Sequence, residues 1–119
     1  MQLDKATIDK LAIHLETAEL EAFDVTKITD DYPQMDWDDA YAIQDAIRAR
    51  KEARGNKTVG LKAGLTSFAK MKQMGVEVPC FGFVSDYMSR PDGGDIKTSE
   101  LIHPKVEAEI CVVTKAPLK

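Results

Sequence analysis

The sequence has few cysteines and lacks any long apolar run. Cys80 and Cys111 show neither C-x-x-C nor metal-finger spacing, so we predict buried, reduced thiols and no redox motif. Apolar runs such as Ile110–Val113 are far shorter than the roughly 18 residues that a membrane helix needs. The start Met-Gln-Leu-Asp-Lys lacks a signal-peptide pattern. We therefore predict a cytoplasmic protein with no membrane segment.

An excess of positive charge is also missing. The formal net charge is −4 and the pI is about 5.1, which argues against a protein that binds nucleic acid by neutralising phosphates. The charge is unevenly distributed: residues 1–45 hold 12 Asp or Glu against 3 Lys, whereas residues 46–119 hold 8 against 13 Lys or Arg. The second part would attract a small anion, although solvated charge on both parts explains the asymmetry as well.

The remaining composition is that of a globular domain. The chain has 119 residues, of which 44% are hydrophobic and 30% charged. A chain of this size buries about two thirds of its unfolded surface, enough for a core without disulfides or metals. The sequence therefore predicts one domain at most.

The first half of the sequence is predicted to be helical. Apolar residues recur at helical spacing over about residues 7–20, and Asp4 or Thr7 can cap that helix. The segment Phe23–Gln34 contains polar turn residues and a proline, which predict a connecting loop.

A second helix is predicted to begin at a capping box made by Asp36 and Asp39 and to end at Gly55-Asn56. On this helix, Tyr41 and Gln44 face either a partner or the core. Its last turns carry four cations that suit the negative end of the helix dipole, which favours a structural role for them: Arg48, Arg50, Lys51 and Arg54.

A strand, a glycine turn and a short helix follow in that order. The strand is predicted over Thr58–Lys62 and the helix over Phe68–Met74, with Thr66 or Ser67 as its cap. This order directs the free N–H groups of the helix start toward the place where the lysine at the strand end emerges, which suits a carboxylate or an enolate oxygen. A single glycine turn before a helix is common, so a purely structural role fits the same residues.

The rest of the chain has β character. Val76–Tyr87 is rich in Val and Phe, Pro91–Asp95 is a turn sequence, and Leu101–Thr114 resumes an extended pattern. Because helices lead and strands follow, the predicted fold class is α+β.

A pair of carboxylates is the most informative feature of the last segment. If that segment is a strand, Glu107 and Glu109 share one face with Cys111, and their Cα atoms lie about 6.6–6.8 Å apart. Both side chains could then reach one hard cation such as Mg²⁺. A solvated Glu-x-Glu on an exposed face is the alternative, and His103 is either a further ligand or a structural residue.

Several motifs occur in an order that resembles one known family. They are Gly60-Leu-Lys-Ala-Gly-Leu-Thr-Ser67, Met74-Gly-Val76, Pro79-Cys-Phe-Gly82 and Ile102-His-Pro-Lys-Val-Glu-Ala-Glu-Ile110. Together with Tyr41-Ala-Ile-Gln44 in the second helix, they resemble the 4-oxalocrotonate (2-oxohex-3-enedioate) decarboxylase and 2-hydroxypentadienoate hydratase family of the fumarylacetoacetate hydrolase superfamily. The resemblance spans essentially the whole chain.

The resemblance implies a fold and a metal. It implies Mg²⁺ or Mn²⁺ held by Glu107, Glu109 and a third acidic residue further along the family's sequence. Family members are roughly twice as long as this chain. We therefore expect the first part of a fumarylacetoacetate hydrolase-like fold, with an N-terminal helical region at residues 1–57 and the start of a β-rich catalytic domain at 58–119.

The resemblance also implies an activity. We expect a lyase that decarboxylates 2-oxohex-3-enedioate to 2-hydroxypenta-2,4-dienoate and CO₂ in the meta-cleavage catabolism of aromatic hydrocarbons. Lys62 is the expected catalytic residue, and the N–H groups near Leu65, Thr66 and Ser67 are expected to bind the substrate. The expected partners are this small 2-oxo dicarboxylate and the hydratase of the same pathway.

Two alternatives remain open from the sequence. Hydratases of the family usually carry an aspartate where this chain has Cys80, which favours the decarboxylase over 2-hydroxypenta-2,4-dienoate hydratase. A non-catalytic fragment or assembly module is the other alternative, because the third metal ligand is not in this sequence.

Overall fold

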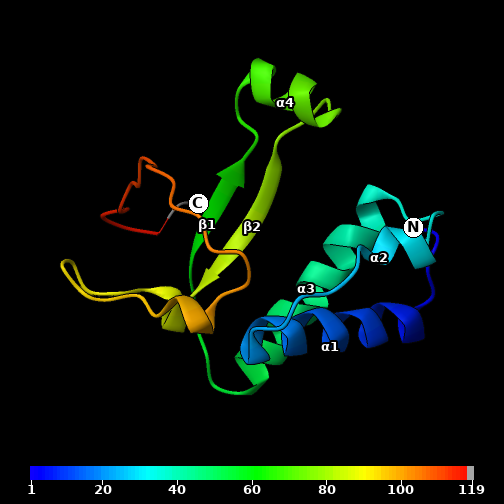
Figure 1. Cartoon of the computed structure of the whole chain (residues 1–119), viewed down its shortest axis with the longest axis horizontal. Helices are drawn as coiled ribbons and strands as arrows, with labels where there is room; N and C mark the ends of the chain where they lie inside the picture. The colour runs from blue at the N-terminus through cyan, green and yellow to red at the C-terminus, as the bar shows by residue number, and fades with distance from the viewer. Residues whose placement is uncertain (118–119) are drawn as a thin grey trace.

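The computed structural model describes residues 1–117. Two long helices lie side by side, and a β-hairpin rises from them with a short helix at its tip (Figure 1). In chain order the elements are α1 (Lys5–Glu21), α2 (Ile28–Asp31), α3 (Trp37–Ala53), β1 (Thr58–Gly64), α4 (Phe68–Met74) and β2 (Cys80–Ser85), followed by 3₁₀ turns at Asp86–Met88 and Thr98–Glu100. The α+β class is confirmed.

Helix α1 forms where the apolar periodicity predicts it. Asp4 is the N-cap, and its carboxylate accepts a hydrogen bond of 2.8 Å from the backbone N–H of Thr7. The helix ends at Ala22, whose left-handed φ of 53° stops the helical hydrogen bonding. Its apolar stripe packs against α3 in a small core made of Leu3, Ile8, Leu11, Ala12 and Ile43.

The prediction of a loop throughout Phe23–Gln34 was wrong in one place. One turn of helix, α2, forms at Ile28–Asp31. Ile28 and Tyr32 pack against the core between α1 and α3, and this tertiary contact outweighs the turn-forming composition of the segment.

The capping box at the start of α3 is confirmed. The carboxylate of Asp36 accepts a hydrogen bond from the N–H of Asp39 at 2.9 Å, and Asp39 accepts one from the N–H of Asp36 at 3.1 Å. Asp39 is fully buried, and its carboxylate also accepts hydrogen bonds from the backbone N–H groups of Gln2 and Leu3. The chain start is thereby attached to the first turn of α3.

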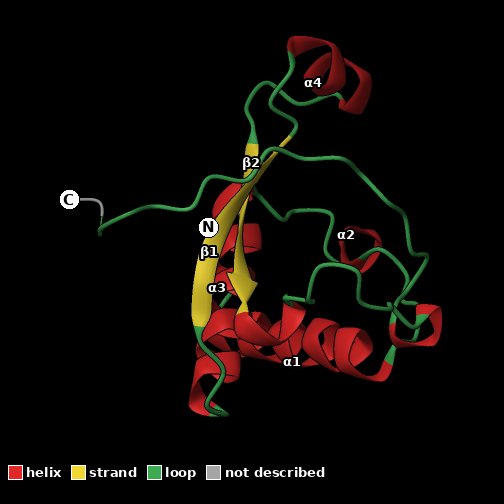
Figure 2. Ribbon diagram, turned by 90° about the vertical axis from the view of Figure 1, so that its left-hand side faces the viewer, coloured by secondary structure: helices red, strands yellow, loops and turns green. Residues whose placement is uncertain are grey.

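The two strands form one antiparallel hairpin, and α4 lies within its connection. Figure 2 shows the strands side by side, with α4 beyond one end of the hairpin and α1 near the other. The register pairs Lys62 with Gly82 and Gly64 with Cys80, so β1 extends two residues beyond the predicted end. The helices α1, α2 and α3 all come before the first strand in the chain. The division into a helical region at 1–57 and the start of a catalytic domain at 58–119 stays a prediction.

The predicted strand at Leu101–Thr114 does not form among the described residues. Residues 104–114 belong to no helix or strand, and Val106 and Ile110 are 100% and 95% exposed. A strand needs a neighbour that pairs with its N–H and C=O groups, and within residues 1–117 the two strands β1 and β2 pair with each other alone. Alternation of residue types in the segment was therefore insufficient to predict its structure.

The prediction of two buried thiols was also wrong. Both cysteines are free, but Cys80 is half-buried at the start of β2 and Cys111 is exposed in the unpaired segment. Within the described part of the chain, no helix is both long and apolar enough to cross a membrane.

Candidate active site

Lys62 and Glu109 are the two predicted site residues that the structure brings together. Lys62 lies on β1 opposite Gly82, and its Nζ is 3.2 Å from Oε1 of Glu109. The two side chains are 53% and 58% exposed, so water screens the pair and it contributes at most about 1 kcal/mol to stability. Its importance is geometric: the pair brings together a cation and a carboxylate that are separated by 47 residues in the sequence.

Glu107 is exposed in the same segment as Glu109. Two carboxylates are the type of ligand that Mg²⁺ and Ca²⁺ take in proteins. Residues 1–117 nevertheless contain no group of three or more His, Cys, Asp or Glu side chains that could hold a metal ion. The described residues therefore supply the donor chemistry for such an ion but not a complete set of ligands.

The turn between β1 and α4 has an unusual backbone. Leu65 adopts a left-handed φ of 55°, a conformation that costs a residue with a side chain about 1–2 kcal/mol. Ser67, rather than Thr66, is the N-cap of α4, and its Oγ accepts a hydrogen bond of 3.2 Å from the N–H of Lys70. The bounds of α4 at Phe68–Met74 are confirmed. The turn thus places Leu65, Thr66 and Ser67 directly after the strand that carries Lys62.

His103 contacts Asp24 rather than the carboxylate pair Glu107 and Glu109. Its Nε2 is 2.8 Å from Oδ2 of Asp24, in the chain after α1. This hydrogen bond, helped by one from the N–H of Val25, holds the pKa of the Asp24 carboxyl below its ordinary value. Of the two roles open for His103 from the sequence, the structure favours the structural one.

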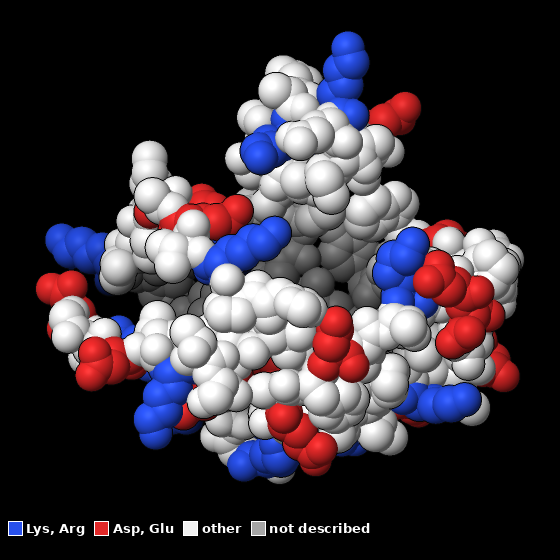
Figure 3. Space-filling view, viewed as in Figure 1, with Lys and Arg blue, Asp and Glu red and all other residues white. Residues whose placement is uncertain are grey.

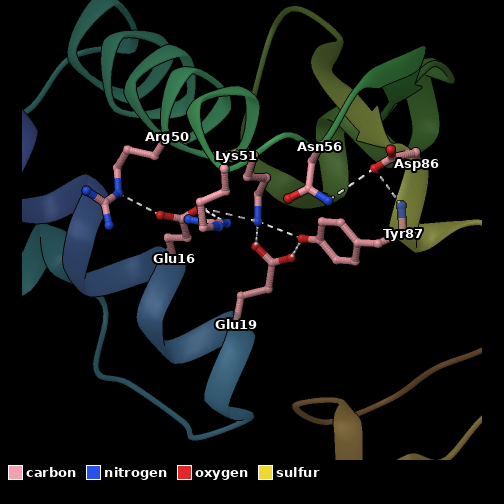
Figure 4. A network of polar contacts seen from close by, with 8 residues as sticks. Glu16, Glu19, Arg50, Lys51, Asn56, Asp86 and Tyr87 are labelled. Atoms are coloured by element: carbon pink, nitrogen blue, oxygen red, sulfur yellow. Dashed lines mark hydrogen bonds and ion pairs between the residues drawn. The ribbon is translucent and has the colours of Figure 1, made fainter.

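A second polar cluster, which sequence reasoning missed, joins α1 to α3 (Figure 4). Glu16 is only 1% exposed, and its carboxylate accepts hydrogen bonds from Arg50 at 2.6 Å and from Arg54 at 2.7 Å. Burial raises the pKa of Glu16, but the hydrogen bonds from the two arginines outweigh it and hold the pKa below the ordinary value. The carboxylate is therefore ionised at neutral pH.

Lys51 extends this cluster to the chain after β2. Its side chain is also 1% exposed, and Nζ donates to Glu19 at 2.8 Å and to the hydroxyl oxygen of Tyr87 at 2.6 Å. The Tyr87 hydroxyl in turn donates to Glu19, and Nζ lies 5.1 Å from the centre of the tyrosine ring. Burial lowers the pKa of Lys51, but these partners outweigh it and the pKa is raised overall. Burial and the bond to Glu19 raise the pKa of Tyr87.

The sequence held a partial signal for this cluster. The cations near the end of α3 suit the helix dipole, and their predicted structural role agrees with the contacts of Arg50, Lys51 and Arg54. Their acidic partners on α1 could not be found from spacing, because charges on two helices meet only when the helices pack.

Two cavities near the helices, within residues 1–117, are lined by neither Lys62 nor Glu109. One of about 360 Å³ lies between α1, α3 and β2 and is lined by residues including Leu15, Ile43 and Phe83. Another of about 520 Å³ lies beside Tyr87 and Leu101. Figure 3 shows charges of both signs around the rim of one face and a mostly uncharged hollow at its centre. Because their side chains are more than half exposed, Lys62 and Glu109 lie on an open surface at the hairpin.

Comparison with known proteins relates most of the chain to one group of enzymes. No family model matches the chain. Over 116 residues, or 98% of this chain and 44% of the relative, it is 63% identical to 4-oxalocrotonate decarboxylase from Pseudomonas putida. It is 66% identical to the enzyme of that name from Pseudomonas sp. strain CF600, over 91% of this chain and 41% of the relative. Over nearly all of its length the chain is thus similar to members of the decarboxylase and hydratase family.

Within this family the decarboxylases are more similar to the chain than the hydratases are. The chain is 45% identical to 2-keto-4-pentenoate hydratase from Paraburkholderia xenovorans strain LB400, over 72% of this chain and 32% of the relative. A solved structure of 4-oxalocrotonate decarboxylase from Pseudomonas putida G7, complexed with magnesium and adipate, matches with a TM-score of 0.84 and 57% identity. This match covers 86% of the chain and 39% of that structure. A second structure of the enzyme was solved with calcium and acetate.

The chain spans less than half the length of the family members that it matches. Lys62, Glu107 and Glu109 all lie in the stretch that matches the Pseudomonas putida enzyme, because that match covers 98% of the chain. The family likeness therefore extends over the candidate site.

Proposed function

We propose that the chain forms part of a decarboxylase that converts 2-oxohex-3-enedioate to 2-hydroxypenta-2,4-dienoate and CO₂. The observation that carries this proposal is the identity of 63–66% with decarboxylases, against 45% with a hydratase of the same family. The reaction would belong to the meta-cleavage catabolism of aromatic hydrocarbons. Adipate, which was bound in the related structure, is a six-carbon dicarboxylate like the proposed substrate.

Lys62 is proposed to bind the end of the substrate that carries the 2-oxo group and its neighbouring carboxylate. Its half-exposed ammonium group is accessible to an anion and can exchange a proton at Nζ with the enolate oxygen that forms as CO₂ leaves. N–H groups near Leu65, Thr66 and Ser67 are proposed to add hydrogen bonds. The left-handed backbone at Leu65 supports this role, since such conformations gather at binding sites.

Glu107 and Glu109 are proposed as two ligands of a divalent cation, Mg²⁺ or Mn²⁺. Their carboxylates fit a hard cation, and a related enzyme was solved with magnesium. When bound, such an ion supplies a Lewis acid that draws electrons toward the 2-oxo group. Within the described residues Glu109 is partnered by the Lys62 ammonium, so this lysine offsets one of the two negative charges of the pair.

The second candidate is a chain that is inactive alone and acts as an assembly module. The observation that favours it is the incomplete set of ligands within residues 1–117. Association with the pathway hydratase and a cytoplasmic location stay predictions.

The proposal is tested by CO₂ release from 2-oxohex-3-enedioate with added Mg²⁺ and with EDTA as a control. Both the 119-residue chain and the longest chain that its gene encodes are assayed. Metal-dependent release by the longest chain is expected. Hydration of 2-hydroxypenta-2,4-dienoate without CO₂ release would instead identify a hydratase.

Replacement of Lys62 tests its role in the same assay. Lys62→Met is expected to lower turnover by about three orders of magnitude, because both the anion contact and the proton at Nζ are lost. The circular dichroism spectrum should be unchanged, since the side chain is exposed. The exposed Lys10→Met on α1 is the matched control, and equal activity of the two variants would remove Lys62 from the mechanism.

A further inference from the structure

The outer edge of β2 is bonded to two side chains of α3. At Phe81 the backbone N–H donates to the hydroxyl oxygen of Tyr41 at 3.3 Å, and the backbone carbonyl accepts from Nε2 of Gln44 at 2.9 Å. Tyr41 and Gln44 are three residues apart on α3 and therefore lie on the same face of the helix. One supplies an acceptor and the other a donor, as a neighbouring strand would.

This contact lies next to Lys62 in the hairpin. Phe81 pairs with Ala63, and the following residue of β2, Gly82, pairs with Lys62. In an antiparallel pair the N–H and C=O of one residue point to the same edge of the strand, and those of the next residue point to the other edge. Because the polar groups of Phe81 face α3, those of Gly82 face β1 at the position of Lys62.

The helix that provides these side chains is itself well fixed. Ile43, between Tyr41 and Gln44, is 2% exposed in the core. Trp37 stacks on the ring of Tyr41 one turn away, with ring centres 6.2 Å apart and an angle of 29° between the planes. The tyrosine hydroxyl is therefore held by an aromatic contact as well as by its hydrogen bond.

We propose that Tyr41 and Gln44 are positioning residues for Lys62. They attach the free edge of β2 to the helical core, and through the pairing of Gly82 with Lys62 they set where the lysine emerges from the hairpin. This inference rests on the proposed function, in which Lys62 binds the substrate. The proposed catalytic mechanism assigns no role to the Tyr41-Ala-Ile-Gln44 motif. This inference assigns a role to two of its residues.

The contact itself is tested by amide hydrogen exchange in the 119-residue chain. An N–H at a strand edge exchanges quickly unless something binds it, so protection of the Phe81 amide reports the Tyr41 hydroxyl. Tyr41→Phe is expected to speed exchange at Phe81 about three- to tenfold, the effect of losing one hydrogen bond. Tyr32→Phe is the matched control. Equal exchange at Phe81 in Tyr41→Phe and the unmodified chain would overturn the proposal.

A fold control accompanies this measurement. A phenyl ring at position 41 still stacks on Trp37, the one tryptophan of the chain, so its fluorescence should be the same in Tyr41→Phe as in the unmodified chain. If the fluorescence changes, and if exchange is accelerated throughout α3 as much as at Phe81, the substitution has destabilised the fold as a whole. That result would count against a local contact.

A double-mutant cycle in the longest encoded chain distinguishes a role in positioning Lys62 from a role in stabilising the fold alone. Gln44→Leu is expected to lower kcat about 10- to 100-fold, with a smaller change in KM, because a displaced lysine loses transition-state contacts first. In a Lys62→Met background the same change is expected to have no further effect, since there is no lysine left to position. Gln34→Leu, at an exposed residue before α3, is the matched control.

The outcomes separate this inference from the proposed function. Independent, multiplicative losses for Gln44→Leu and Lys62→Met would overturn the positioning role while leaving Lys62 in the mechanism. Full activity of Lys62→Met would overturn the role of Lys62 and the positioning role with it. Non-multiplicative losses together with faster exchange at Phe81 would support the inference.

Discussion

At the scale of single residues, Glu16 shows how a buried charge is stabilised. Its carboxylate is almost completely removed from water, yet two arginines and a lysine surround it: Arg50, Arg54 and Lys51. Removing one member of such a group leaves the others without a partner, which costs more than the intact group contributes. No buried side-chain nitrogen or oxygen within residues 1–117 lacks a hydrogen-bond partner.

We expect Glu16→Gln to lower the free energy of unfolding at pH 7 by about 2–3 kcal/mol. The cost is limited because both arginine side chains are about two fifths exposed and regain water. Urea unfolding measures this loss in the free energy of unfolding, and Glu21→Gln, at an exposed residue at the end of α1, is the control. A loss no larger than that of the control would show that the arginines do not depend on Glu16.

The pH dependence of the same variant follows from the lowered pKa of Glu16. In the folded chain this pKa lies below its ordinary value of 4.5, so the ionised carboxylate favours folding. The stabilisation is complete above about pH 4.5 and is lost as the pH falls through the lower folded-state pKa. The stability difference between the unmodified chain and Glu16→Gln should therefore narrow below pH 4.5.

At the scale of elements, the start of α3 connects the helix to the beginning of the chain. The α-amino group of Met1 lies 2.8 Å from the carboxylate of Asp36. This contact, followed by the hydrogen bond from the N–H of Asp39, lowers the pKa of Asp36 to about 2. Burial raises the pKa of Asp39, but hydrogen bonds from the N–H groups of Leu3, Asp36 and Gln2 lower it overall.

Asp39→Asn should lower the Tm by several degrees at pH 7, because α3 loses half of its capping box and the chain start loses a charged acceptor. Asp38→Asn, whose side chain is 82% exposed, should leave the Tm nearly unchanged. The difference is expected above pH 4 and should shrink as the pH falls through the lowered pKa of Asp39, since its carboxylate then becomes protonated and loses its charge. An equal Tm for the two variants would contradict this account; thermal melts followed by circular dichroism decide it.

At the scale of the whole molecule, the segment 104–114 differs from the rest. Its apolar side chains are 80% exposed or more: Val106, Ile110, Val112 and Val113. Within residues 1–117, the segment has no backbone hydrogen bond, and its one side-chain hydrogen bond is the Lys62–Glu109 pair. We expect its amides to exchange at nearly unprotected rates in the 119-residue chain, while amides of α1 and α3 are strongly protected. Slow exchange in this segment, measured by NMR, would show that it pairs with something.

A metal titration of the same chain tests the number of ligands. Two carboxylates without further protein ligands bind Mg²⁺ weakly, so millimolar Mg²⁺ is expected to raise the Tm by less than about 1 °C. Glu107→Gln is the matched comparison and should show the same small shift. A rise of several degrees that Glu107→Gln abolishes would mean that the chain completes a site by itself.

Local chemistry made much of this fold predictable from the sequence. Asp4 and the Asp36–Asp39 box cap helices through hydrogen bonds to residues three positions away. Ser67 caps the start of α4 in the same way. Such signals depend on neighbours in the chain, so they survive without knowledge of the rest of the molecule. The ordered motifs likewise indicated the family to whose members the comparisons find the chain similar.

Contacts between distant residues were decided by the tertiary structure alone. Glu16 meets Arg50, Lys62 meets Glu109, and Phe81 meets Gln44 only because two helices and a hairpin pack together. Many charges and amides of the chain could form such pairs equally well, and spacing does not select among them. The exposure of residues 104–114 follows the same rule, because alternating residues form a strand only when another strand pairs with their backbone.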